Sequence, residues 1–243
     1  MGQLEHKVAI VTGGGSGIGK AIAEAFLREG CAVTIAGRNA KRLRAAAEEL
    51  RAGGGEVWDV PTDVVQEEQV QELFRQVMAR HGRLNILVNS SGAFDGGPLE
   101  ELTLETWNKV IGANLTGPFL CTREAFRIMK PAGGGRIINI GSISAQRTRM
   151  NNAPYTSSKF GIWGLTQSAA LEGRPYGIAV SCLHPGNTAV EWRLDEGIEM
   201  NREPMVAPEE MARVALLMAT LPPEANMLEA IVLPVKQLYI GRG

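Results

Sequence analysis

The sequence predicts an α/β fold: one doubly wound, seven-stranded parallel sheet with helices on both faces. Short apolar, β-branched runs alternate with longer stretches whose apolar residues recur at the helical period. Because parallel neighbours need crossover connections, this repetition is typical of a parallel sheet covered on both sides. The chain has 243 residues, 44% hydrophobic and 21% charged, which suits a large buried core. No composition break divides it, and we expect a single domain over residues 1–243.

The elements follow one another in strand–helix order. The strand-like runs cover residues 8–11, 32–36, 57–60, 86–88, 136–140, 179–183 and 228–233. The helical stretches cover residues 21–28, 41–51, 67–80, 106–129, 155–172 and 208–220. Glycine triplets at 53–55 and 133–135 follow helical stretches and are expected to cap them. One long irregular stretch near the C-terminal end predicts a substrate lid at about 187–205.

Charge and cysteine usage argue against several classes of function. Lys and Arg total 25 against 26 Asp and Glu, so no charge excess favours nucleic acid or a membrane surface as partner. Cys31, Cys121 and Cys182 are widely spaced and lack metal-ligand patterns, which predicts reduced core thiols and no metal site. No apolar signal region and no run of 18 apolar residues is present, and we expect a cytoplasmic protein.

A glycine-rich turn follows the first predicted strand and opens the first helix. Glycine lets the backbone turn with positive φ and approach a pyrophosphate, and the helix N-terminus supplies unpaired N–H groups. This arrangement predicts a dinucleotide cradle of the Rossmann type. Its candidate cofactor-binding residues are Gly13, Gly15, Ser16, Gly17, Ile18 and Gly19.

Two motifs of other enzyme classes, the Walker A loop and the G-x-S-x-G motif of serine hydrolases, are incomplete or absent. A Walker A loop from Gly14 to Lys20 would need a following Ser or Thr, but Ala21 follows, and no Mg²⁺ ligand is present there. A serine hydrolase would use Ser142 and His184, yet no serine lies in a G-x-S-x-G motif. Phosphate hydrolysis and acyl hydrolysis are therefore disfavoured.

The end of the second strand favours NADP over NAD as cofactor, with NAD possible. NAD-binding domains place an acid there for the ribose hydroxyls, whereas this chain has Arg38, which suits a 2′-phosphate. Lys41 and Arg42 either add to that positive field or are ordinary solvated helix residues. Asp63, followed by Val64, either accepts from the adenine amino group or caps the next helix.

The pair Tyr155 and Lys159 predicts proton chemistry. Residues four apart on a helix share one face, so the ammonium lies near the phenol and favours the phenolate. Ser142 ends a predicted strand, and ligands of open parallel sheets sit beyond the carboxyl ends of strands. These three side chains are candidates for acid–base work at a carbonyl oxygen.

The order and spacing of these motifs resemble the short-chain dehydrogenase/reductase family over essentially the whole chain, in particular its 3-oxoacyl-ACP-reductase-like members. The resemblance rests on Thr12-Gly13-x3-Gly17-x-Gly19, Asn114, Ser142, Tyr155, Lys159 and Pro185-Gly186. It implies that Tyr155 is the general acid or base and that Ser142 positions the substrate oxygen. It further implies that Lys159 binds the nicotinamide ribose and that Asn114 holds a water. The cofactor contacts it implies also include Val64, Asn89, Gly92, Pro185, Gly186 and Thr188.

The chain departs from the family pattern in three segments. The family commonly has Asn-Asn-Ala-Gly after the fourth strand, where this chain has Asn89-Ser90-Ser91-Gly92. An aliphatic residue and a Thr usually follow Pro-Gly, but Thr188 and Val190 stand there. The basic residue that many NADP-preferring members carry before the second motif glycine is Ser16, so Arg38 is the main evidence for NADP.

Function divides between two hypotheses. The first is an NADP(H)-dependent oxidoreductase acting on a small-molecule carbonyl or secondary alcohol, and the alternative is a catalytically idle dinucleotide-binding sensor or scaffold. Substrate walls are expected from residues 94–98, 144–153 and the lid, including Trp192, Arg193 and Met200. Arg147, Arg149 and Arg193 either meet a polar or anionic substrate or are solvated. By family analogy we expect a homotetramer formed through the two long helices.

Overall fold

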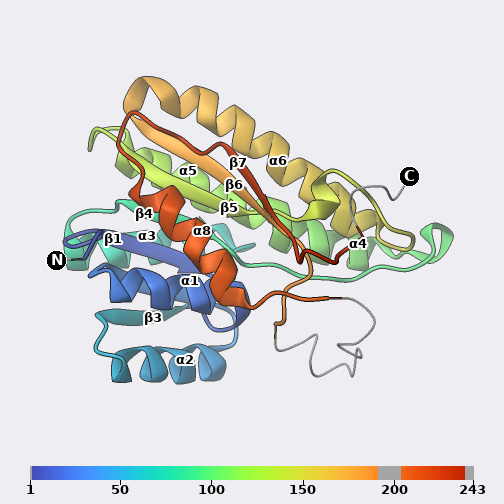
Figure 1. The fold of residues 1–243 in the computed structure, drawn as a ribbon, viewed down its shortest axis with the longest axis horizontal. Helices are drawn as coiled ribbons and strands as arrows, with labels where there is room; N and C mark the ends of the chain where they lie inside the picture. Colours follow the sequence, from blue (N-terminus) through green and yellow to red (C-terminus); the bar gives the residue numbers. More distant parts are fainter. Residues whose placement is uncertain (1, 191–203, 239–243) are drawn as a thin grey trace.

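The computed structural model describes residues 2–190 and 204–238, and the seven predicted strands form one parallel sheet in the order β3-β2-β1-β4-β5-β6-β7 (Figure 1). The doubly wound α/β prediction is confirmed, because the strand order reverses between β1 and β4. The strands are β1 (Val8–Thr12), β2 (Ala32–Gly37), β3 (Val57–Pro61), β4 (Ile86–Asn89), β5 (Gly135–Ile140), β6 (Ile178–Pro185) and β7 (Glu229–Val232).

The helices cover the sheet in two layers. They are α1 (Gly17–Arg28), α2 (Ala40–Ala52), α3 (Glu67–His81), α4 (Leu104–Ile111), α5 (Gly117–Met129), α6 (Ala153–Gly173) and α8 (Pro208–Thr220). Helices α1, α2 and α8 pack on one face, and α3, α5 and α6 pack on the other (Figure 1). Strand β1 shows why: Val8 and Ile10 enter one core while Ala9 and Val11 enter the other.

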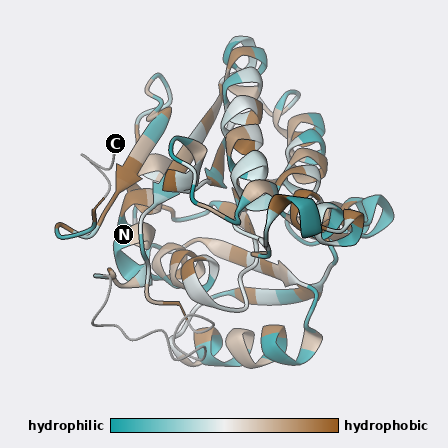
Figure 2. Ribbon diagram, turned by 90° about the vertical axis from the view of Figure 1, so that its right-hand side faces the viewer, coloured by the Kyte–Doolittle hydropathy of each residue, from teal (hydrophilic) through white to brown (hydrophobic). Residues whose placement is uncertain are grey.

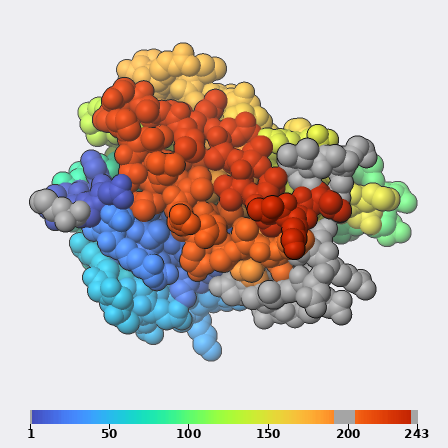
Figure 3. Space-filling model, viewed as in Figure 1, coloured from blue at the N-terminus to red at the C-terminus, as the bar shows by residue number. Residues whose placement is uncertain are grey.

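The helices of both layers bury apolar residues against the sheet, and Figure 2 shows apolar strands between helices that carry many hydrophilic residues. In α2, Asn39 caps the N-terminus by accepting from the Arg42 N–H at 3.0 Å. Leu43, Ala47 and Leu50 recur at helical spacing and are buried against the sheet. In the space-filling view, the orange and red surface of α8 and β7 adjoins the blue surface of α1 (Figure 3).

The predicted helix over residues 106–129 is interrupted. The chain forms α4, then a π-helical turn over Gly112–Thr116, then α5. The Gly117 N–H bonds to the Gly112 oxygen, five residues back, which places one extra residue in the turn. The apolar period continues through the bulge, so the sequence pattern does not reveal it. Asn114 lies inside this turn.

Strand β6 runs further than the sequence pattern predicts and ends at Pro185 rather than residue 183. The extension is paired, because His184 lies opposite Ile231 and Pro185 opposite Val232 in β7. It brings His184 and Pro185 to the edge where β1, β4 and β5 also end. Among the described residues, no helix is long and apolar enough to cross a bilayer.

Candidate active site

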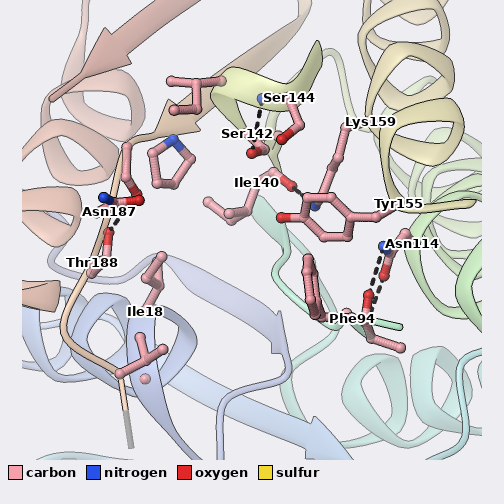
Figure 4. Close-up of a pocket in the computed structure, with 18 of the residues that line it drawn as sticks. Ile18, Phe94, Asn114, Ile140, Ser142, Ser144, Tyr155, Lys159, Asn187 and Thr188 are labelled. Carbon is pink, nitrogen blue, oxygen red and sulfur yellow. Dashed lines mark hydrogen bonds between the residues drawn. The ribbon is translucent and has the colours of Figure 1, made fainter. Parts of the chain in front are cut away.

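A cavity of about 600 Å³ lies at the carboxyl ends of the strands (Figure 4). Its walls come from the turn after β1, the ends of β4, β5 and β6, the π-helical turn and the start of α6. Of the predicted residues it is lined by Gly13, Ser16, Gly17, Ile18, Gly19, Gly92, Asn114, Ser142, Tyr155, Lys159, Pro185, Gly186 and Thr188. Residues distant in sequence therefore meet where the strand order reverses.

A second cavity of about 490 Å³ adjoins the first. Gly13, Ser16 and Gly92 line both, so the two form one elongated depression. The second cavity also contains the predicted residues Gly15, Arg38, Asp63 and Val64. An extended ligand with an adenosine at one end and a reactive ring at the other fits such a shape.

The turn after β1 is held by a contact that the sequence pattern does not predict. The Thr12 hydroxyl accepts from the N–H groups of Ser90 and Ser91, at 3.1 and 3.2 Å, and lies 3.4 Å from the Val88 oxygen. Gly13 has φ of 67°, and a Cβ there would lie 2.6 Å from the Ser90 oxygen. Thr12 stands directly before the glycines at a strand end, which is the one local signal of its role. The glycine-rich turn is thus fixed to the end of β4.

The N-terminus of helix α1 opens on the first cavity, which Gly17, Ile18 and Gly19 line. Ser16 is the N-cap residue, yet its side chain makes no capping hydrogen bond, and no acidic residue occupies the first turn. The positive end of the helix dipole, with no acidic side chain beside it, suits an anion. The residues present therefore fit the pyrophosphate of a dinucleotide.

Tyr155 and Lys159 project from α6 into the cavity (Figure 4). The Lys159 Nζ lies 5.4 Å from the centre of the Tyr155 ring and donates to the Ile140 oxygen at 2.9 Å. Lys159 is buried, with 6% of its surface exposed, so its ammonium is poorly screened. The Phe94 ring meets Tyr155 edge to face, with centroids 5.0 Å apart. This arrangement orients the phenol beside a fixed positive charge.

Ser142 lies at the end of β5 with an extended backbone. Its Oγ accepts from the Ser144 N–H at 3.1 Å, which leaves the hydroxyl hydrogen free to donate into the cavity (Figure 4). A hydroxyl held in this way can bind a substrate oxygen beside Tyr155.

Asn114 fastens the segment after β4 to α6. Its Oδ1 accepts from the Ala93 N–H at 2.7 Å, and its Nδ2 lies 2.9 Å from the Ala93 oxygen and 3.0 Å from the Ser158 Oγ. The side chain is buried, at 2% exposed. These contacts position the backbone that carries Phe94, while the implied water site stays a prediction.

The Asn89 side chain points into the core, and its cofactor contact stays a prediction. It lines neither cavity; its Nδ2 donates to Asn139 at 2.8 Å and Thr122 at 3.2 Å, inside the core. Asn139 in turn donates to Thr166 at 2.9 Å. The network ties β4 and β5 to α5 and α6, because buried amides need partners. Asn89 thus braces the strand ends from behind the cavity.

Asp63 lines the second cavity, and its carboxylate accepts from the Val65 N–H at 3.3 Å. Helix α3 begins at Glu67 with Gln66 as its N-cap, so the capping alternative for Asp63 is wrong. The adenine contact stays a prediction. Lys41 lies outside both cavities, whereas Arg42 lines the second.

Some of the residues expected to form substrate walls line the first cavity, and their contact with a substrate stays a prediction. Phe94, Ser144, Arg149, Met150, Asn151 and Asn152 line the first cavity, and Arg147 does not. Asn187, Thr188 and Val190 line it at the start of the predicted lid. Trp192, Arg193 and Met200 lie outside the described residues. Among the residues that the structure describes, no group of three or more His, Cys, Asp or Glu could hold a metal ion.

Known proteins share this sequence pattern. The sequence model of short chain dehydrogenases matches residues 7–198. An uncharacterized oxidoreductase of Bacillus subtilis is 39% identical over 183 residues, which are 75% of this chain and 71% of that protein. A 3beta-hydroxysteroid dehydrogenase of Mediterraneibacter gnavus is 34% identical over 189 residues, which are 77% of this chain and 68% of that protein.

Solved structures share the fold as well. A metagenomic short-chain oxidoreductase in complex with NADP has a TM-score of 0.85 at 34% identity, over 96% of this chain and 98% of that one. A variant of actinorhodin polyketide ketoreductase with NADPH has a TM-score of 0.88 at 31% identity, over 96% of this chain and 98% of that one. Together with the Ser142, Tyr155 and Lys159 geometry, these matches show that the chain belongs to the short-chain dehydrogenase/reductase family of oxidoreductases.

Proposed function

We propose that this protein is an NADP(H)-dependent carbonyl reductase or alcohol dehydrogenase. Tyr155 is the general acid or base that gives a proton to the substrate oxygen or takes one from it. The observation that carries the proposal is the gathering of Ser142, Tyr155 and Lys159 around one cavity that the glycine-rich turn also lines. A dinucleotide-binding sensor or scaffold would need only the glycine-rich turn. The presence of Ser142, Tyr155 and Lys159 at the same cavity therefore favours an enzyme. The names of two relatives, a ketoreductase and a hydroxysteroid dehydrogenase, support a ketone or secondary alcohol as substrate.

The nicotinamide, when bound, supplies or accepts the hydride at the substrate carbon. In reduction, the Tyr155 hydroxyl gives its proton to the substrate oxygen, and the Ser142 hydroxyl donates a second hydrogen bond that stabilises charge there. Lys159, held on the Ile140 oxygen, stabilises the phenolate that remains until it is reprotonated from solvent. In alcohol oxidation the same groups act in reverse, and Tyr155 takes the proton.

The cofactor is held along the elongated depression. The N–H groups at the start of α1 take the pyrophosphate, and Arg38 in the second cavity takes the 2′-phosphate of NADP. The NADP and NADPH complexes of two structural neighbours support the same preference. The 3-oxoacyl-ACP-reductase-like subgroup stays a prediction, and 3-oxoacyl thioesters therefore belong in the substrate panel.

The decisive experiment follows NADPH absorbance with a panel of ketones, diketones and 3-oxoacyl thioesters. We expect Tyr155→Phe to lower kcat by about 10²- to 10⁴-fold, because the variant lacks its acidic proton. Tyr176→Phe is the matched control, since Tyr176 lies in the 3₁₀ turn Arg174–Tyr176 and lines neither cavity. Equal turnover by wild type and Tyr155→Phe, or none by either, contradicts the proposal.

We also propose a homotetramer formed through α5 and α6, as the family analogy implies. Phe119 on α5 and Phe160 and Leu171 on α6 expose 45%, 49% and 62% of their surface, and apolar groups of this size favour a protein contact. Light scattering on the purified protein measures the mass, and a monomer at micromolar concentration contradicts this proposal.

A further inference from the structure

His184 is a buried imidazole that no step above uses. It lies near the end of β6 with 0% of its surface exposed. Its Nδ1 lies 2.8 Å from the carbonyl oxygen and 3.3 Å from the nitrogen of Ser142. We infer that His184 is a positioning residue which holds the backbone of Ser142 so that the serine hydroxyl faces the reacting oxygen. This inference rests on the proposed function.

The ring packs directly beneath the turn after β5. A Cβ at Gly141 would lie 2.6 Å from the His184 Nδ1 and 2.8 Å from the Cys182 Sγ. Glycine therefore lets the backbone rest on the imidazole at this point. The Gly141 N–H donates to the Leu183 oxygen at 2.7 Å, so β6 holds two consecutive residues of the turn.

The hydrogen-bond partner assigns the tautomer of His184. Two groups of Ser142 compete for Nδ1: the N–H, at 3.3 Å, would need a lone pair there, and the carbonyl oxygen, at 2.8 Å, needs a hydrogen. We assign the hydrogen to Nδ1 because the contact with the carbonyl oxygen is the shorter one and that oxygen only accepts. The Nε2 then carries a lone pair. It has no hydrogen-bond partner among the described residues, although the Glu229 Oε1 lies 3.4 Å away.

Burial supports the neutral ring. Desolvation lowers the pKa of His184 below its ordinary value, and the Lys159 ammonium lowers it further, against opposing effects of Ser142 and Glu229. At neutral pH the ring therefore donates from Nδ1 alone, and the bond to Ser142 is its one strong polar contact.

The same turn is tied to β7 at a second point. The Gln146 Nε2 donates to the Glu229 Oε1 at 2.6 Å, and Glu229 lies opposite Cys182 in the sheet. The 3₁₀ turn Ile143–Ala145 lies between the two attachments. Strands β6 and β7 thus fix both ends of the segment that carries Ser142, while the Ser144 N–H fixes its Oγ.

Three substitutions at one position separate a hydrogen bond from packing. His184→Asn places an amide nitrogen where Nδ1 lies, His184→Gln places it where Nε2 lies, and His184→Leu offers neither. We expect His184→Gln and His184→Leu to lower kcat by about 10- to 100-fold, because a small displacement of a catalytic group is costly. His184→Asn should stay within about threefold of wild type, and the Kd for NADPH should hardly change in any of the three.

Two further readouts do not depend on turnover. Hydrogen exchange of the amides in residues 142–146 should accelerate in His184→Gln and His184→Leu and stay slow in His184→Asn. Nitrogen-15 shifts of labelled wild-type histidine should show a protonated Nδ1 and a bare Nε2, a test that requires no variant to fold. If the wild type is inactive on every substrate, the proposed function is wrong. Hydrogen exchange of residues 142–146 would still test whether His184 positions Ser142.

Three results overturn the inference. The first is unchanged exchange and unchanged kcat in His184→Leu, and the second is a His184→Asn variant that binds NADPH but is as slow as His184→Leu. The third is a hydrogen found on Nε2 rather than Nδ1 in the wild type.

Discussion

Replacing Arg38 by Asp tests how the second cavity selects between NADPH and NADH. Arg38 is exposed at this cavity and follows the last residue of β2. The substitution removes a guanidinium that would bond the 2′-phosphate and sets a negative charge beside it. NADH has no phosphate at that carbon, so its binding should be nearly indifferent to the change.

The size of the effect follows from two contributions. A hydrogen bond to a charged group contributes about 1.5–3 kcal/mol. Repulsion between unit charges about 4 Å apart costs about 1 kcal/mol in bulk water and about 4 kcal/mol at an effective dielectric of 20. Because Arg38 is exposed, we take the lower value. The sum of about 2.5–4 kcal/mol corresponds to a roughly 50- to 1,000-fold weaker interaction with NADPH.

The assay compares kcat/KM for NADPH and NADH, with Kd measured by fluorescence titration. Arg44→Asp is the matched control, since Arg44 is an exposed residue of α2 that lines neither cavity and its replacement makes the same charge change. Raising the salt concentration should narrow the gap between wild type and Arg38→Asp, because ions screen exposed charges. An unchanged NADPH to NADH ratio in Arg38→Asp refutes the assignment of Arg38.

Two further predictions concern the glycine turn and the core. Gly13→Ala and Gly54→Ala both place a side chain at positive φ, but only at Gly13 does a Cβ meet backbone, while nothing lies within 4 Å of one at Gly54. Gly54→Ala should lower Tm by roughly 2–8 °C. Gly13→Ala should lower Tm more than that and should also weaken NADPH binding. An equal decrease in Tm in the two variants, with normal NADPH binding by Gly13→Ala, contradicts this prediction. Burial raises the pKa of Cys31, Cys121 and Cys182 to about 12, so at pH 8 a disulfide reagent should label none of them in the folded protein and all after denaturation. Rapid labelling of the folded protein contradicts this second prediction.

The fold and the centre of the candidate site could be predicted from the sequence, because both depend on short-range periodicities. Alternating strand and helix patterns determine a parallel sheet, and the carboxyl edge of that sheet is a fixed place for ligands. Tyr155 and Lys159 share a helix face whatever surrounds them. The glycine turn is equally local, since its residues are consecutive.

Other features depend on how distant strands align. Thr12 lies opposite Asn89 across β1 and β4, and Asn89 lies opposite Asn139 across β4 and β5. That register turns the Asn89 amide into the core and brings the Thr12 hydroxyl to the backbone of Ser90. No pattern within β4 alone distinguishes these outcomes.

The sequence by itself therefore determined the parallel α/β architecture, the dinucleotide turn and the spacing of the Tyr155 and Lys159 pair. Only the tertiary structure decided the contact of Asn114 with Ala93, the side-chain direction of Asn89 and the contact of His184 with Ser142. The physical reason is how far apart in the sequence the interacting residues lie. Periodicity and turn chemistry act over a few neighbouring residues, whereas these contacts join residues 21–50 positions apart and exist only once the strands are in register.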